Sequence, residues 1–211
     1  MIAYLIHDST RTDREPYVAE ALRQVPGLEV LAPVPERTPI LSCHKTHRYA
    51  WHRGAQYADP DRDAICVLED DVRFTPAWTT DFWLKCEAWL MRSSYDLLLG
   101  GVSHGGNPVA LADPTFTTML EIGRFTATHC YLLKPRAVPE LLTQQDTKHA
   151  DAAMSDAQIR RAVLAPFVAT QWPGRSDIRM IQVNDDWTFI QAEHRLKKVL
   201  GLADGRPVRH P

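Results

Sequence analysis

The sequence has no long apolar run and no strong excess of charge of either sign. No stretch of the 211 residues approaches the roughly 20 apolar residues that a transmembrane helix needs. The first residues lack the basic segment that opens a signal peptide and turn polar at Asp8. The formal net charge of -2 gives no global attraction to nucleic acid or to an anionic membrane. We therefore expect a protein with no membrane span.

Two common cofactor-binding patterns are also missing. The four cysteines are widely spaced and form no Cys-x-x-Cys pair, which argues against a zinc ribbon. Free thiols are typical of a reducing compartment, so we expect a cytoplasmic protein. The chain has no Gly-x-x-x-x-Gly-Lys-Ser/Thr loop, which argues against a P-loop enzyme.

Apolar runs typical of buried strands alternate with segments of helical periodicity. The predicted strands cover 2–7, 28–31, 64–68, 95–100, 128–133 and 164–169. The predicted helices cover 17–25, 43–56, 78–91, 135–142, 152–162 and a terminal segment from residue 187. This alternation predicts an α/β fold with a mostly parallel sheet flanked by helices. We expect one domain over 1–200 and a flexible tail over 201–211.

Three consecutive carboxylates, Glu69, Asp70 and Asp71, follow the apolar strand predicted at 64–68. Open α/β sheets bind ligands beyond the carboxyl ends of their strands, where these side chains would project. Adjacent carboxylates repel one another unless a cation compensates them, and Mg²⁺ or Mn²⁺ prefers oxygen ligands. In an extended chain Glu69 and Asp71 point to the same side and can share one ion. A solvated acidic turn is the alternative interpretation.

The residues around this cluster resemble glycosyltransferase family 25, which includes lipopolysaccharide and collagen galactosyltransferases. Ala64-Ile-Cys-Val-Leu-Glu-Asp-Asp-Val72 is similar to the Leu-Glu-Asp-Asp segment of that family. Four more segments match in the expected order: 2–14, 42–51, 95–100, and a closing pattern of Pro166, Gln171 and Ser176-Asp177-Ile178. The resemblance spans roughly 1–180. The stretch 100–125 looks reduced or divergent, and Ile6-His7-Asp8 departs from the usual opening sequence.

The resemblance implies a fold of the GT-A type, in which a nucleotide-diphospho-sugar transferase sheet binds the donor. It implies transfer of a sugar, with galactose or glucose favoured, from a UDP-sugar to an acceptor hydroxyl, with inversion. It also implies Mn²⁺ or Mg²⁺ as cofactor, with Asp71 as the main ligand and Glu69 as its partner. Asp70 is assigned to substrate binding and is an alternative partner of Asp71.

The resemblance also assigns roles outside the acidic cluster. Asp151 opens a predicted helix and is the candidate general base that takes the acceptor proton; it can equally be a helix N-terminal acid. Arg14 is a candidate for holding the diphosphate, although an ordinary exposed arginine is an equal alternative. His47 is expected to contact the donor or to order the acidic loop, and a purely structural role stays open. Gln171 and Asp177 are expected to line the donor or acceptor pocket.

Other functions compete with this hypothesis. A non-catalytic binding protein can retain the fold, and a metal-dependent phosphoryl or nucleotidyl transferase can use the same carboxylates. The expected acceptor is a glycan, a protein or another hydroxyl compound. A modified nucleic-acid base is a further alternative, which a concentrated basic groove would indicate; the scattered Lys and Arg residues do not demand one.

Overall fold

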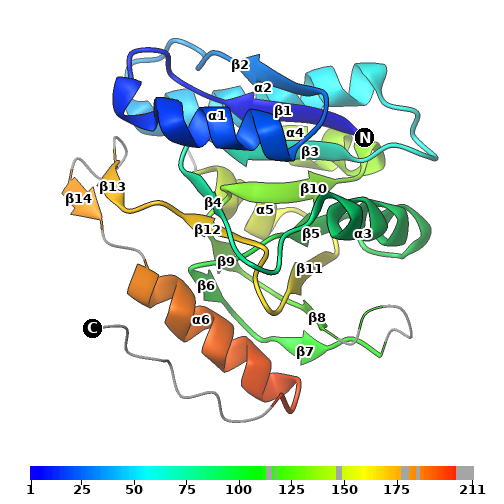
Figure 1. Cartoon of the computed structure of the whole chain (residues 1–211). Helices are drawn as coiled ribbons and strands as arrows, with labels where there is room; N and C mark the ends of the chain where they lie inside the picture. The colour runs from blue at the N-terminus through cyan, green and yellow to red at the C-terminus, as the bar shows by residue number, and fades with distance from the viewer. Residues whose placement is uncertain (113–115, 117, 146–148, 177–180, 184–185, 203–211) are drawn as a thin grey trace.

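A central sheet of eight strands organises the described part of this computed structural model, which comprises residues 1–112, 116, 118–145, 149–176, 181–183 and 186–202 (Figure 1). Across the sheet the strands are β2 (Leu28–Leu31), β1 (Ile2–Ile6), β3 (Ile65–Glu69), β10 (Cys130–Leu133), β5 (Leu97–Leu99), β11 (Arg161–Leu164), β8 (Met119–Glu121) and β7 (Val109–Ala110). β1 is parallel to β2 and β3, and β5 is parallel to β11. β10 runs antiparallel between β3 and β5, and β8 runs antiparallel to β11 and β7. The predicted α/β class is confirmed, with a mixed sheet.

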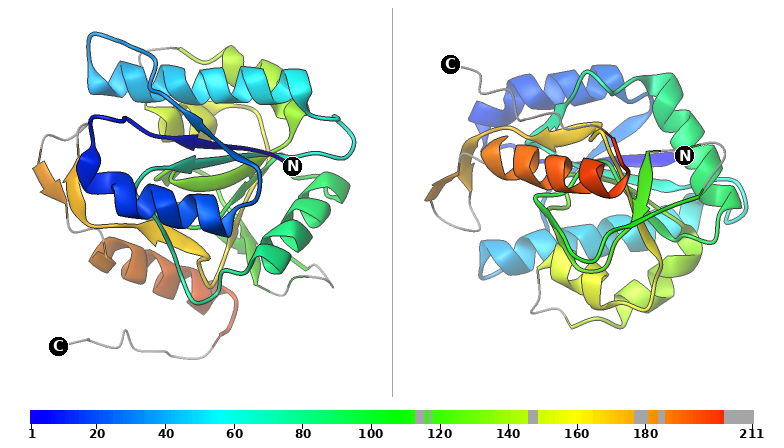
Figure 2. Two further views of the ribbon diagram at one scale, coloured as in Figure 1. Left: turned by 45° about the horizontal axis from the view of Figure 1, so that its top comes forward. Right: turned by 90° about the horizontal axis from the view of Figure 1, so that it is seen from below.

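Helices cover both faces of the sheet (Figures 1 and 2). The described helices are α1 (Glu15–Gln24), α2 (Pro39–Tyr57), α3 (Thr80–Arg92), α4 (Val138–Leu142), α5 (Ala150–Asp156) and α6 (Asp186–Val199), with 3₁₀ turns η1 (Thr12–Arg14) and η2 (Pro135–Ala137). Successive strand residues point to opposite faces. Val67 therefore belongs to a core with α2, α4, α5 and α6, while Leu68 belongs to a second core with α1 and α3.

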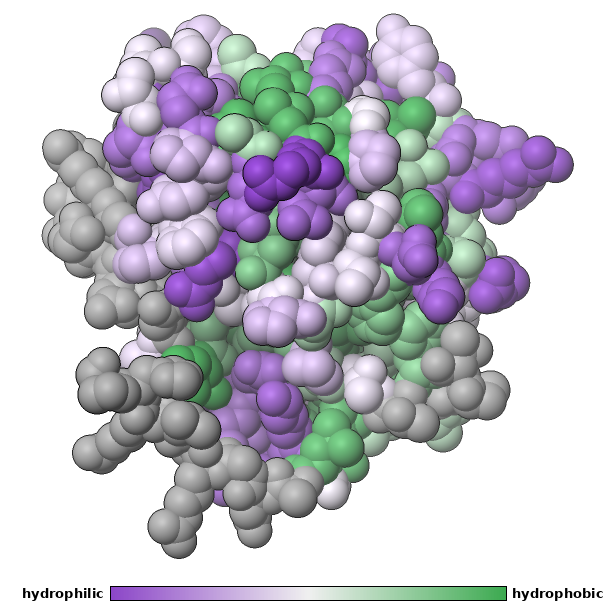
Figure 3. Space-filling model, in the orientation of Figure 1, coloured by the Kyte–Doolittle hydropathy of each residue, from purple (hydrophilic) through white to green (hydrophobic). Residues whose placement is uncertain are grey.

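The tryptophans at 51, 78, 83 and 89 are buried in these two cores. Trp51 is fully buried on α2. Trp83 and Trp89 lie on α3 and Trp78 lies just before it, and all three belong to the core that α3 forms with the sheet. Hydrophilic and apolar side chains are interspersed on the face shown in Figure 3, where the apolar ones form small separate groups. The described helices include none that is both long and apolar enough to cross a membrane.

Two predictions near residue 160 are wrong. The helix expected over 152–162 ends at Asp156, and Arg161–Leu164 is strand β11, three residues before the strand expected over 164–169. A short apolar run such as Ala162-Val163-Leu164 fits a buried strand or a buried helix equally well. Pairing with β5 on one side and β8 on the other decides in favour of the strand.

Several short strands were not predicted. Two of them, β7 and β8, belong to the central sheet. The others form three two-stranded sheets within the described residues: β4 (Val72–Phe74) with β12 (Ala169–Gln171), β6 (His104–Gly105) with β9 (Phe125–Thr126), and β13 (Gly174–Ser176) with β14 (Ile181–Val183). Each is only two or three residues long, which is too short for a periodic pattern to show in the sequence. Of the tail predicted over 201–211, residues 203–211 lie outside the described residues.

Candidate active site

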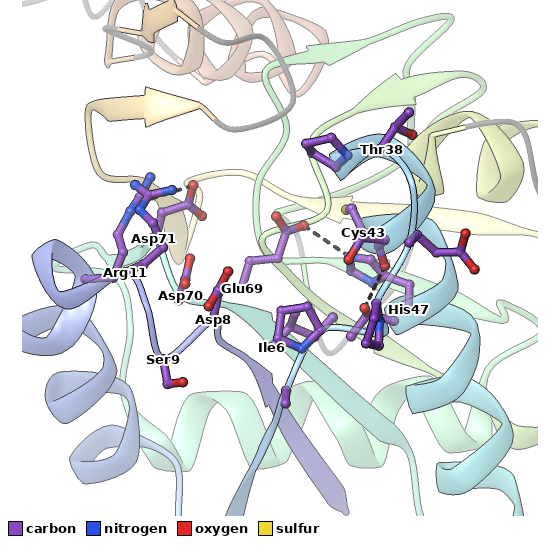
Figure 4. A pocket seen from close by; sticks show the side chains of 18 of the residues that line it. Ile6, Asp8, Ser9, Arg11, Thr38, Cys43, His47, Glu69, Asp70 and Asp71 are labelled. Atoms are coloured by element: carbon purple, nitrogen blue, oxygen red, sulfur yellow. Dashed lines mark hydrogen bonds and ion pairs between the residues drawn. The ribbon is translucent and has the colours of Figure 1, made fainter.

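The candidate site lies where β1 and β3 end side by side. Ile6 pairs with Glu69 in the parallel register, so the loop after β1 and the acidic segment after β3 leave the sheet at the same edge. The first turn of α2 reaches this edge from the other side (Figure 4). Thr38 begins that helix, because its hydroxyl accepts a hydrogen bond from the Leu41 N–H and Pro39 occupies the first helical position.

A cavity of about 800 Å³ opens at this edge. Its volume falls within the usual range of ligand-binding pockets. The residues that line it come from the ends of the two strands, the loop after β1, the proline-rich loop before α2, the first turns of α2 and strand β12: Ile6, Asp8, Ser9, Arg11, Arg14, Ala32, Pro33, Pro35, Glu36, Thr38, Pro39, Ser42, Cys43, Thr46, His47, Glu69, Asp70, Asp71 and Gln171.

The cavity carries more negative than positive charge. Five of its lining residues are carboxylic acids and two are arginines. Burial, together with the neighbouring charges of Glu69 and Asp70 and against the opposing charge of Arg14, raises the pKa of Asp71 to about 7. Burial likewise raises the pKa of Asp70, against the hydrogen bond from His7. Ionising Asp70 and Asp71 in this site is therefore unfavourable, and a bound cation would stabilise their ionised forms.

Glu69 is held by two side chains from distant segments. The Thr128 hydroxyl donates a hydrogen bond of 2.6 Å to Glu69 Oε1, and His47 Nε2 lies 3.4 Å from the same oxygen. Burial by itself would raise the pKa of Glu69, but the contacts with His47 and Thr128 outweigh it and the pKa is lowered. Glu69 is thus the member of the acidic cluster that the protein keeps ionised.

Asp70 and Asp71 lie in a turn between β3 and β4. His7 Nδ1 is 3.0 Å from Asp70 Oδ2, and Arg14 Nη1 is 3.4 Å from Asp71 Oδ2. The prediction that Glu69 and Asp71 point to the same side of an extended chain is wrong, because Glu69 ends β3 and Asp71 lies in the turn. In Figure 4 Glu69 reaches toward His47 on α2, whereas Asp71 lies near Arg11.

The residues present fit a divalent cation that shares its ligands with a substrate. Asp71 Oδ1 is buried and has no hydrogen-bond partner among the described residues. Within that same part of the chain no cluster of three or more His, Cys, Asp or Glu residues is arranged to hold a metal ion by itself. Mg²⁺ typically takes one or two carboxylates and completes its coordination with water and substrate phosphates. Asp71, with Glu69 or Asp70, would supply the one or two carboxylate ligands that such an ion takes from the protein.

Asp151 does not line this cavity, although it is connected to it. Its carboxylate accepts hydrogen bonds from the N–H groups of Ala127 (3.3 Å) and Ala152 (2.7 Å). The next residue after Ala127 is Thr128, which binds Glu69. Ala127 has φ of 84°, a conformation that favours glycine. Consecutive residues of one strained segment therefore link Asp151 and Glu69.

Six of the eight predicted site residues lie together in the cavity: Arg14, His47, Glu69, Asp70, Asp71 and Gln171. Gln171 reaches it because β12 pairs with β4, where Gln171 faces Val72 directly after the acidic turn. Arg14 is 5% exposed, so the ordinary-exposed-arginine alternative is wrong. Asp151 lies apart, and Asp177 lies outside the described residues.

The sequence analysis missed Asp8, Ser9 and Arg11, which also line the cavity. The polar run that follows the first strand was a usable signal, because it leaves the sheet at the same edge as the acidic cluster. Cys43 and Glu36 had no such signal, because only the packing of α2 and its preceding loop brings them to the cavity. Glu36 forms an ion pair with Lys45 there.

Comparisons with known proteins leave the function open. No protein-family model and no curated protein matches the chain. One solved structure with some likeness is the 4-diphosphocytidyl-2C-methyl-D-erythritol synthase of Anaerococcus prevotii, with 11% identity over 93% of this chain and 78% of that one. Its TM-score is 0.33, which is too low to carry a functional argument. The resemblance to glycosyltransferase family 25 therefore stays a prediction.

Proposed function

We propose that this protein is a metal-dependent glycosyltransferase of the GT-A type, which transfers a hexose, galactose or glucose, from a UDP-sugar to an acceptor hydroxyl with inversion. The observation that carries the proposal is the cavity at the carboxyl edge of β1 and β3, where three successive carboxylates face two arginines. The motif resemblance supplies the choice of donor sugar.

The charge of the cavity explains why the proposal includes a cation. A nucleotide diphosphate would bring negative charge into a cavity that already has an excess of carboxylates. Asp71, with Glu69 or Asp70, would hold Mn²⁺ or Mg²⁺ through oxygen ligands. When bound, such an ion supplies positive charge that stabilises the leaving nucleotide diphosphate. Without it, the same cavity would repel the donor.

The two arginines orient the donor. Arg14 is almost fully buried and its guanidinium lies 3.4 Å from Asp71, and Arg11 lines the same side of the cavity. A guanidinium presents a planar fork that matches phosphate oxygens, so this pair can fix the diphosphate beside the acidic turn. Arg11 is held in turn by a bidentate ion pair with Asp13.

Inversion requires a group that removes the proton of the acceptor hydroxyl. We assign this role to Asp151, which lies outside the lining of the cavity, so the acceptor would have to bind between it and the donor. Its carboxylate accepts from two backbone N–H groups and is linked through Ala127 and Thr128 to Glu69. The acceptor is a glycan, a protein or another hydroxyl compound. A nucleic-acid acceptor is not indicated, because the cavity carries excess negative charge and would repel a phosphate backbone.

The experiment is a thermal-shift and donor-hydrolysis screen of UDP-, GDP- and CMP-sugars, each with and without Mn²⁺. We expect one UDP-hexose to raise the Tm and to be hydrolysed slowly, only when Mn²⁺ is present. Asp71→Asn should lose both effects, whereas the matched control Asp61→Asn, at an exposed residue outside the cavity, should keep them. A non-catalytic binding role is the better interpretation if the donor binds without hydrolysis or transfer. No binding of any nucleotide-sugar under any metal condition rejects the proposal.

A further inference from the structure

A buried chain of polar contacts leads from the core of the protein to Glu69. Tyr131 and His47 are fully buried, and so is Trp51. The Tyr131 hydroxyl lies 2.7 Å from Trp51 Nε1 and 2.8 Å from His47 Nδ1. The other ring nitrogen, His47 Nε2, lies 3.4 Å from Glu69 Oε1. The three aromatic residues come from α2 and β10, which the sequence separates by about 80 residues.

The direction of each hydrogen bond in this chain follows from the donor inventory. An indole N–H can only donate, so the Tyr131 oxygen accepts from Trp51. The Tyr131 hydrogen then needs an acceptor, because a buried hydroxyl without one is costly. Within the described residues His47 Nδ1 is the acceptor in reach. His47 Nδ1 therefore carries no hydrogen, and a neutral imidazole in this position must carry its hydrogen on Nε2.

We propose that Tyr131 is a positioning residue that fixes His47 as the Nε2–H tautomer, so that this N–H faces Glu69 Oε1 across their 3.4 Å contact. Thr128 donates to the same oxygen. Thr128 and His47 thus both approach Oε1 and leave Oε2 as the oxygen of Glu69 that can face a ligand in the cavity. Tyr131 acts from the core, through His47, and does not line the cavity itself.

An effect of Tyr131 on cation binding rests on the proposed function, whereas the assignment of the His47 tautomer does not depend on it. Partners that orient a ligating group typically change metal affinity or activity 10–100-fold when they are lost. If Glu69 helps to hold a cation, Tyr131→Phe should weaken Mn²⁺ binding by about tenfold. Trp51→Phe is the matched control, because it removes an aromatic N–H from the same buried chain but leaves the Tyr131 hydrogen bond to His47.

The test is the ¹⁵N NMR spectrum of ¹⁵N-histidine-labelled protein at pH 8, with the His47 signals assigned by their loss in His47→Gln. We expect the Nε2–H tautomer for His47 in the wild type and in Trp51→Phe. In Tyr131→Phe we expect a mixture of tautomers or the Nδ1–H form. A circular-dichroism melt of each variant verifies that the fold is retained.

Two results would overturn the inference. An Nδ1–H or doubly protonated His47 in the wild type would contradict the direction of the hydrogen bonds, and this spectrum needs no variant to fold. An unchanged Nε2–H tautomer in folded Tyr131→Phe would show that Tyr131 does not set it. Manganese titration, followed by electron paramagnetic resonance, is read separately. Absence of Mn²⁺ binding in the wild type would count against the proposed function and leave the tautomer assignment intact.

Discussion

The two ends of the central strands bury charged groups in different ways. Near the amino ends of β3 and β5, two buried charged groups have backbone hydrogen-bond partners: Lys134 Nζ donates to the Ser93 carbonyl at 2.7 Å, and the Glu87 carboxylate accepts from the Ala64 N–H at 3.0 Å. At the carboxyl ends, Glu69, Asp70 and Asp71 crowd one another, and the pKa of Asp71 rises to about 7. The same sheet thus buries isolated charged groups at one end and a cluster of like charges at the other.

The difference separates a structural role from a functional one. Isolated buried charged groups with backbone partners belong to the fold, whereas like charges that raise one another's pKa in a cavity are typical of sites that await a ligand. Stability and binding should therefore respond to different substitutions at the two ends. Substitutions at the carboxyl ends should change ligand binding, and substitutions at the opposite end should change stability alone.

The largest effect should be on donor turnover. Asp71→Asn keeps the shape of the side chain but removes the charge that we propose to hold the cation, and we expect metal-dependent donor hydrolysis to fall by about 100-fold or more. Initial rates at saturating Mn²⁺ measure it, with Asp61→Asn as the control. Activity within about threefold of the wild type would mean that Asp71 is not the main ligand.

The second effect is on the pH dependence of ligand-free stability. The pKa of Asp71 is about 7 in the folded protein and 3.8 in an unperturbed chain, so the folded state binds more protons between these pH values. Stability should therefore fall as the pH rises from about 4 to about 7, by about 2–4 kcal/mol from this group. Glu69, with its lowered pKa, contributes in the opposite direction below its ordinary value.

Urea unfolding across this pH range, for the wild type and Asp71→Asn, isolates the contribution of Asp71. The variant should lose this decline and be more stable than the wild type at pH 8 in the absence of metal. Equal pH profiles for the two proteins would show that folding does not raise the pKa of Asp71.

The opposite end of the sheet should affect stability alone. Lys134→Met keeps most of the buried stem but removes the hydrogen bond to the Ser93 carbonyl, so we expect a loss of about 1–3 kcal/mol in the free energy of unfolding. Donor and Mn²⁺ affinities should not change. If Lys134→Met weakened binding as much as Asp71→Asn does, the division between the two ends would fail.

The smallest effect concerns the strained link between Asp151 and Glu69. Ala127→Gly should stabilise the protein by about 0.5–1 kcal/mol, because glycine adopts the φ of 84° without the steric cost that alanine has. Thermal unfolding measures the change. The same variant tests whether the backbone conformation of Ala127 positions Asp151. A gain in stability together with slower sugar transfer would indicate that it does.

The core elements were predictable because their signal is local. The buried strand before Glu69, the helix that follows Thr79 and the terminal helix at Asp186–Val199 all show their periodicity in the sequence. The acidic cluster was likewise visible, because three carboxylates after an apolar strand are adjacent in the chain. The strand Arg161–Leu164 was misplaced, because only its neighbours β5 and β8 distinguish it from a helix.

The α/β class and the position of Glu69, Asp70 and Asp71 at a strand end could be predicted from the sequence alone, since each depends on residues that are neighbours in the chain. Arg14, His47 and Gln171 join those carboxylates in one cavity only because the chain packs in three dimensions. The same packing brings Thr128 and the Tyr131–His47 pair to Glu69. These contacts join residues about 20 to 100 positions apart, and their geometry depends on strand order and helix packing, which no local pattern encodes.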